Sequence, residues 1–131
     1  MALRKLTAAE VTFEVYTQSD NTPLEGNVMA TNEPDLDKEA EDGIRARLER
    51  GDYEAWCGVC VKATWRCAAG VEYSGSAALW GCSLDDAYTA AVAADEHGLH
   101  AEALADLQSS LALQAARCAS IARTLRARKA G

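Results

Sequence analysis

Alternating apolar and polar residues predict three β-strands. Val11, Phe13 and Val15 alternate with polar neighbours, which is the period-2 pattern of a half-buried strand. A longer alternation covers residues 54–66, and after a turn at 67–70 a third covers residues 71–82 as its antiparallel partner. We expect one face of these last two strands to lie in the core: Ala55, Cys57, Val59, Val61, Ala63, Trp65, Val71, Tyr73, Ala77 and Leu79.

Two glycine-containing stretches interrupt the strand pattern. Gly75 predicts a bulge or a loose stretch within the third strand. Residues 24–30 are compatible with a short extended segment, which Gly26 and Asn27 weaken.

A first helix is predicted over residues 32–51. Asn32 is a suitable N-cap, Pro34 suits the first turn, and Gly51 suits the position just after the helix. Four apolar residues recur every four positions and form one narrow stripe: Leu36, Ala40, Ile44 and Leu48.

Two further helices follow the third strand. Ser83 and Asp86 form a near capping box, which predicts a short helix that ends near Gly98. Its inward residues are expected to be Leu84, Tyr88, Ala91 and Val92. Residues 99–128 form the last helix, because no Gly or Pro interrupts them.

The order β-α-β-β-α-α predicts an α+β fold, in which helices lie on one face of a three-stranded antiparallel sheet. The length of 131 residues suits a single domain over residues 1–131, and 49% apolar residues is normal for a globular protein. Residues 1–8 are expected to be a flexible N-terminus.

The last helix carries a heptad pattern. Leu104, Leu111, Cys118 and Leu125 recur every seven residues, and a second set lies three positions further on: Leu107, Gln114 and Ile121. A helix of this length spans roughly 45 Å, whereas a domain of this size is only about 36 Å across. The helix is therefore expected to overhang the domain or to pair with a second copy as a homodimer; the alternative is a kinked helix packed wholly on its own sheet.

Charge is distributed unevenly along the chain. Residues 1–106 hold all 20 acidic residues and 8 of the 13 basic ones, so their formal charge is 8 − 20 = −12. Residues 107–131 hold five basic residues and no acidic one. The body should attract cationic surfaces and repel nucleic acid, although solubility alone would also explain its acidity.

No apolar run is long enough to span a bilayer or to act as a secretory signal, so we expect a cytoplasmic protein without a membrane partner. Its five cysteines should then stay reduced.

Candidate chemistry is sparse. Cys57 and Cys60 form a C-x-x-C motif similar to that of thioredoxin-type proteins, but strand alternation places them on opposite faces of the sheet. A zinc site would combine Cys57 and Cys60 with ligands from Cys67, Cys82, His97 or His100. Structural zinc sites usually contain two closely spaced ligand pairs, and the sequence contains only one C-x-x-C pair. No nucleotide-binding loop or nucleophile motif is present. The sequence therefore predicts a non-enzymatic protein without a cofactor, and a thiol or zinc protein stays as an alternative.

Two surfaces are candidates for partner binding. Trp56, Trp80 and Tyr16 are expected on the outer face of the sheet, where exposed aromatic residues are typical interface anchors. The alternative is that the last two helices cover this face. The second surface is the last helix, through the heptad positions given above.

Five segments resemble a family of short acidic proteins encoded by bacteriophages and prophages, mostly of unassigned function. The segments are Leu24–Ala30, Asp37–Glu39, Arg47–Asp52, Ala55–Cys57 and Gly81–Ser83, and the resemblance covers roughly residues 10–107. It implies an accessory protein that acts in the bacterial cytoplasm and inhibits a host defence complex that handles nucleic acid, as anti-CRISPR proteins do. A carboxylate-rich helix could occupy a basic groove that normally holds phosphates, as a mimic of DNA. The first helix supplies such an array, although an ordinary solvated helix start would look the same: Asp35, Asp37, Glu39, Glu41 and Asp42. The second hypothesis is a structural or assembly protein that dimerises through its last helix.

Overall fold

The computed structural model describes residues 3–28 and 33–130, with the side chains of residues 128–130 left out. Its elements are η1 (Ala8–Glu10), β1 (Thr12–Ser19), α1 (Pro34–Glu49), η2 (Tyr53–Ala55), β2 (Cys57–Arg66), β3 (Glu72–Cys82), α2 (Ala90–Glu96) and α3 (Leu99–Ala130). The predicted α+β class and the β-α-β-β-α-α order are confirmed.

The three strands form one antiparallel sheet in the order β1-β2-β3. The predicted turn between β2 and β3 is confirmed: Cys67 N–H donates to the Val71 carbonyl, and Gly70 adopts a φ of 85°. Val71 itself is exposed beside this turn, so its predicted place in the core is wrong.

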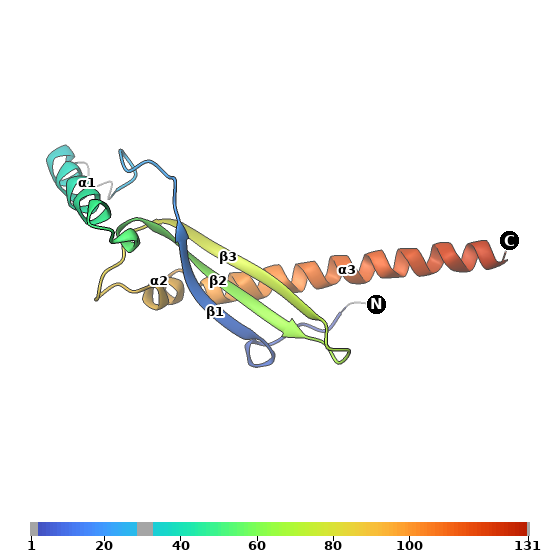
Figure 1. Ribbon diagram of the computed structural model, residues 1–131. Helices are drawn as coiled ribbons and strands as arrows, with labels where there is room; N and C mark the ends of the chain where they lie inside the picture. Colours follow the sequence, from blue (N-terminus) through green and yellow to red (C-terminus); the bar gives the residue numbers. More distant parts are fainter. Residues whose placement is uncertain (1–2, 29–32, 131) are drawn as a thin grey trace.

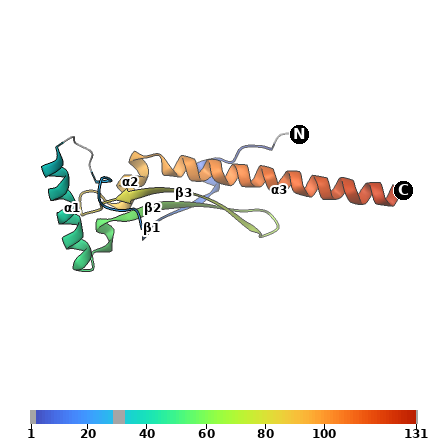
Figure 2. The same cartoon turned by 90° about the horizontal axis from the view of Figure 1, so that it is seen from above.

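Helices α2 and α3 cover one face of the sheet, whereas α1 lies beyond one end of it (Figure 1, Figure 2). The core under α3 is built from the inner face of β2, with Val59, Val61 and Ala63 fully buried against Ala103 and Leu107. The predicted inner-face alternation is thereby confirmed from Cys57 to Trp65, whereas Ala55, predicted on the same face, lies in η2 and packs in the cluster under α1.

Gly75 allows this close contact. A Cβ at Gly75 would lie 2.2 Å from the Leu107 nitrogen and 2.7 Å from the Ala103 carbonyl oxygen. The predicted bulge at Gly75 is wrong, because β2 and β3 stay in regular register there. The irregularity lies instead near Trp80 and Gly81, where Gly58 alone stands opposite two residues of β3 and Gly81 adopts a φ of 71°.

Helix α1 packs in a second, smaller cluster with Ile44, Val28, Ala55 and Trp56 at its centre. Its predicted stripe is confirmed at Ala40, Ile44 and Leu48, which join this cluster, whereas Leu36 is exposed near the helix start. The predicted N-cap Asn32 lies outside the described residues, and Glu33 holds the N-cap position.

Arg47 joins the end of α1 to the segment after β3. Its guanidinium pairs with Asp52 at 2.8 Å and donates to the Ser83 hydroxyl and the Leu84 carbonyl. The extended segment predicted for residues 24–30 is wrong in its described part, because Asn27 N–H closes a turn on the Leu24 carbonyl.

The short helix begins later than predicted. Thr89, not Ser83, is the N-cap, and its hydroxyl accepts a hydrogen bond from Val92 N–H. Asp85 prevents an earlier start, because its carboxylate accepts hydrogen bonds from the N–H groups of Ala87 and Tyr88 and holds a turn. Consequently Ala93 and Ala94 face the core, whereas Ala91 and Val92 are exposed.

Candidate protein-binding surfaces

Trp56 is not part of the outer surface, so that prediction is wrong. Only 6% of it is exposed. The strand begins at Cys57, one residue after Trp56, and the indole turns beyond the sheet end into the cluster under α1. Its Nε1–H donates to the Thr22 carbonyl at 2.8 Å, so the loop between β1 and α1 satisfies its polar group.

Trp80 remains on the outer face and is 49% exposed. Its ring lies over Gly58, where a Cβ would come within 2.4 Å of the indole Cε3. Tyr16 is half-buried and stands opposite Cys60 on the same face. Helices α2 and α3 lie on the other face of the sheet, so the alternative in which they cover the aromatic residues is also wrong (Figure 2).

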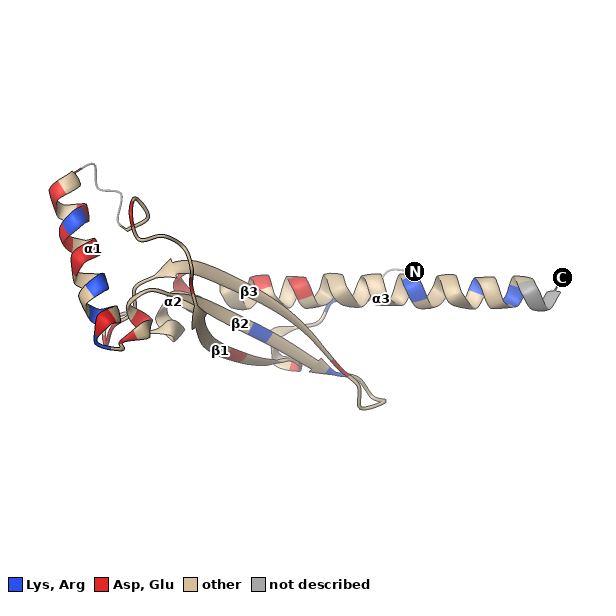
Figure 3. Ribbon diagram, turned by 45° about the horizontal axis from the view of Figure 1, so that its top comes forward, with Lys and Arg blue, Asp and Glu red and all other residues tan. Residues whose placement is uncertain are grey.

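The acidic residues of α1 divide into two groups. Asp35, Glu39 and Asp42 are exposed and share one side of the helix, and Asp42 pairs with Arg45 at 3.2 Å. Glu41 and Asp37 are half-buried on another side, where the Glu41 carboxylate accepts a hydrogen bond from Gly26 N–H. In α1 the acidic residues predominate in the first half and Arg45 and Arg47 lie in the second, whereas the end of α3 is basic (Figure 3).

The heptad pattern of α3, here called the seam, is covered along only its first half. Leu107 is fully buried against the sheet, and Leu104 and Leu111 are half-buried. Cys118 is exposed, as are Ile121 (59%) and Leu125 (60%). The predicted overhang is confirmed: α3 continues well past the sheet in both views (Figure 1, Figure 2). We call residues 112–127 the α3 extension.

An open apolar groove of about 420 Å³ lies where α3 leaves the sheet. Its walls come from three parts of the chain: Leu3 and Leu6 of the N-terminal segment, Trp65 and Tyr73 of the β2–β3 hairpin, and Leu111, Gln114 and Cys118 of α3. Trp65 and Tyr73 stack with ring centroids 6.1 Å apart. No pattern in the sequence predicted this groove, and the two N-terminal leucines, three positions apart, are a weak local signal of it.

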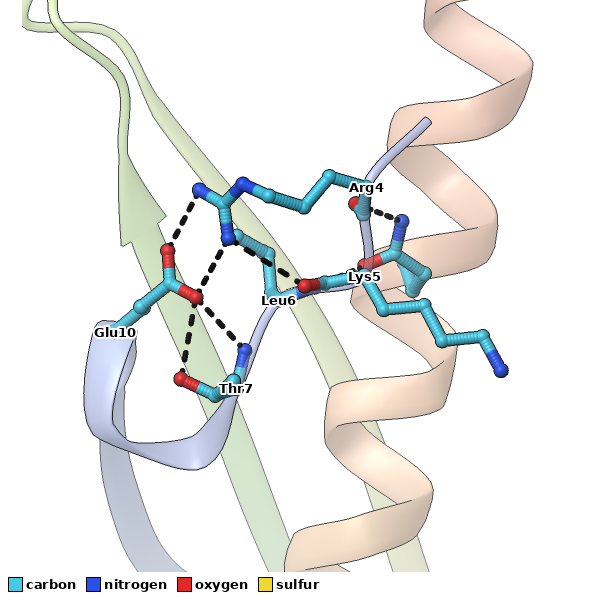
Figure 4. Close-up of polar contacts among 6 residues, drawn as sticks. Arg4, Lys5, Leu6, Thr7 and Glu10 are labelled. Carbon is cyan, nitrogen blue, oxygen red and sulfur yellow. Dashed lines mark hydrogen bonds and ion pairs between the residues drawn. The ribbon is translucent and has the colours of Figure 1, made fainter. Parts of the chain in front are cut away.

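The N-terminal wall of the groove is fixed by hydrogen bonds, within the segment expected to be flexible (Figure 4). Leu6 N–H donates to the Gln108 side-chain oxygen at 2.9 Å, and the Gln108 amide donates to the Arg4 carbonyl. Arg4 and Glu10 form a bidentate pair with two contacts of 2.8 Å, and Glu10 also accepts from Thr7 N–H. Residues of the predicted flexible N-terminus therefore hold defined positions against α3.

This network predicts acid sensitivity. Hydrogen bonds from Arg4 and then from Thr7 lower the pKa of Glu10 to about 2 from its usual 4.5. Because the folded-state pKa is lowered, the stabilisation by Glu10 is present above pH 4.5 and is lost as the pH falls towards 2. Glu10→Gln should therefore be less stable than the wild type near neutral pH and equally stable near pH 2, as measured by urea unfolding across that range. A constant difference at all pH values would contradict the assigned network.

The five cysteines differ in burial. All five are free; Cys57, Cys60 and Cys82 are buried, and Cys57 stands directly opposite Cys82 across the two strands. Burial, reinforced by the neighbouring Cys82 thiol, raises the pKa of Cys57 to about 11, and burial also raises the pKa of Cys60 and of Cys82. Thiols in this state are poor nucleophiles, because the thiolate is the reactive form.

Thiol titration with an aromatic disulfide should therefore proceed in steps. In dilute protein at mildly alkaline pH, exposed Cys118 should react first and half-buried Cys67 second, whereas the three buried thiols should react only on unfolding. Cys118→Ser should remove the fastest step alone. Rapid reaction of Cys57 or Cys82 in the folded protein would contradict this order.

The two histidines do not assemble a metal site. His100 packs edge-on against Phe13 at 5.0 Å, and His97 caps the end of α2. Over residues 3–28 and 33–130, no group of three or more His, Cys, Asp or Glu side chains is placed to hold a metal ion.

Searches with the whole chain found no matching family model, no matching curated protein and no matching solved structure. Of the helices in the described part of the chain, none combines the length and apolar character that crossing a membrane requires.

Proposed function

We propose that this protein is a non-enzymatic protein-binding module and that the α3 extension is its main contact element. One observation carries the proposal: the seam that packs on the sheet at Leu107 continues uncovered at Cys118, Ile121 and Leu125. An amphipathic helix that lays its apolar side against a groove or another helix is a recurrent mode of protein recognition. Helical segments this short are marginal on their own in water, so a partner would also stabilise the extension.

The charge of the extension indicates the kind of surface it fits. Arg117, Arg123 and Arg126 lie within it, and it contains no acidic residue. A matching partner offers an apolar strip to the seam and leaves these arginines in solvent or beside carboxylates.

Site-specific photo-crosslinking tests this proposal. A photoreactive amino acid replaces Ile121 in one variant and Leu113 in a control, where Leu113 is equally exposed at 53% but lies off the seam. We expect a discrete protein adduct from position 121 in cells and none from position 113. Equal adducts from both positions, or none from either, would contradict the assignment of the seam.

A second candidate function follows from the exposed acidic side of α1. Asp35 and Glu39 project from a helix at the opposite end of the molecule from the basic extension (Figure 3). Together with the resemblance to phage accessory proteins, this supports binding to the basic groove of a host complex that handles nucleic acid, in the bacterial cytoplasm.

Charge reversal separates the two candidates. Asp35→Lys/Glu39→Lys should weaken binding to a purified CRISPR effector complex at least tenfold, and DNA should displace the variant at a lower concentration than it displaces the wild type. Asp86→Lys/Glu102→Lys is the matched control, because it changes net charge equally at exposed acidic residues away from α1. Equal losses in both variants would indicate a general charge effect and remove the proposed role of α1.

A further inference from the structure

The exposed and buried parts of the seam lie on one continuous side of α3. Heptad spacing from Leu107 through Gln114 to Ile121, and from Leu111 through Cys118 to Leu125, keeps these residues on the same stripe. The sheet covers this stripe as far as Leu111 and then ends, while the helix continues (Figure 2). A helix docked on the exposed stripe would therefore lie in line with the sheet, with one of its ends at the apolar groove.

A second copy of this chain fits that position. The residues on either side of the exposed stripe are small or neutral, with Ala115 and Ala122 on one side and Thr124 on the other. Arg123 and Arg126 fall at outward-pointing heptad positions, so two extensions can approach without bringing these charges together. Arg117 flanks the stripe, where an antiparallel partner presents neutral Thr124.

The direction of such a pair follows from the place of the sheet. In a parallel pair, both sheets would have to occupy the space between the two helices, because each sheet covers the same side of its own α3 (Figure 1, Figure 2). An antiparallel pair leaves the two sheets at opposite ends. It also brings the end of each basic extension near the groove of the other copy, where Arg4 is paired with Glu10 and Arg66 with Glu72.

We propose that two copies associate through antiparallel α3 extensions and that Leu125 of each copy enters the apolar groove of the other. In an antiparallel pair, residues of the set that contains Cys118 and Leu125 pack against residues of the set that contains Gln114 and Ile121 in the other helix. Cys118 then contacts Ile121 of the second copy, and Gln114, which lines the groove, contacts Leu125 of the second copy. This inference rests on the proposed role of the extension and names its partner.

Sedimentation equilibrium tests the association. The wild type should rise from its chain mass of 14.0 kDa to twice that value as its concentration approaches roughly 1 mM, where contacts of micromolar affinity saturate. Ile121→Asp and Leu125→Asp should stay monomeric. Leu113→Asp adds the same charge at an exposed leucine off the seam and should dimerise like the wild type. A wild type that stays monomeric at every concentration would overturn the proposal. A Leu113→Asp variant that loses the dimer as completely as Ile121→Asp would also overturn it.

Disulfide trapping tests the direction. One protein carries Cys67→Ser and keeps Cys118; the other carries Cys67→Ser, Cys118→Ser and Ile121→Cys. With copper–phenanthroline and oxygen as oxidant, the antiparallel register should trap the mixed pair, whereas each protein alone should stay uncoupled. Coupling within each protein alone would indicate a parallel pair and overturn the arrangement. If the wild type is monomeric while position 121 still crosslinks to another protein, the second copy fails as partner and the proposed function stands.

Discussion

Gly75→Ala is expected to lower the free energy of unfolding by about 3 kcal/mol, the upper range for overpacking a core. The added methyl carbon would lie 2.2 Å from the backbone nitrogen of Leu107 and 2.6 Å from its Cα. Because these are backbone atoms of α3, no side-chain rotation can relieve the contact, and the helix must move away from the sheet. Urea unfolding followed by circular dichroism measures the loss.

Gly43→Ala is the matched control for this prediction. Gly43 lies inside α1, and a Cβ there would meet no atom within 4 Å. The same substitution should therefore stabilise the protein by about 0.5–1 kcal/mol, since alanine is the better helix former. If Gly75→Ala were neutral or stabilising, the close packing of α3 on β3 would be wrong.

Leu107→Ala is expected to cost about 3 kcal/mol, because it removes a fully buried side chain from the centre of the helix–sheet contact. Leu125→Ala should change the stability of the dilute protein by less than about 0.5 kcal/mol, since Leu125 is exposed there. Both leucines belong to the seam, and they differ in whether the sheet covers them. Similar losses at both positions would contradict the division of α3 into a packed half and an extension.

The strands and α3 could be predicted because their hydrophobic patterns are long and agree with the faces that the structure buries. The inner face from Cys57 to Trp65 alternates without a break, and α3 contains no residue that would end it. Which part of the seam is covered could not be predicted, because that depends on where the sheet ends against the helix. Leu107 and Leu125 both follow the heptad pattern, which continues past the end of the sheet.

The predictions for Trp56 and for the start of α2 were wrong for local physical reasons. Trp56 follows the strand alternation, but η2 ends at Ala55 and the loop carrying Thr22 covers the indole, a contact between residues far apart in sequence. Ser83 and Asp86 match a capping box, yet Asp85 holds a turn through its own hydrogen bonds. The same polar residues favour helix starts and turns, so the spacing alone could not decide between them.

The groove illustrates a different limit of sequence reasoning. Leu3, Trp65 and Cys118 come from three distant parts of the chain, and only the fold brings them together. The acidic residues of α1, by contrast, were predictable as a group, but the engagement of Glu41 with Gly26 N–H depends on how the preceding loop folds.

Hydrogen exchange along α3, measured in dilute and in concentrated protein, tests the central claim that the extension is a binding segment. Amides of residues 103–111 should be protected at both concentrations, because the sheet covers that half. Amides of residues 114–125 should exchange rapidly in dilute protein and become protected in concentrated protein, when a second copy covers the seam. Equal, strong protection of both halves in dilute protein would show that the extension needs no partner and would contradict the account.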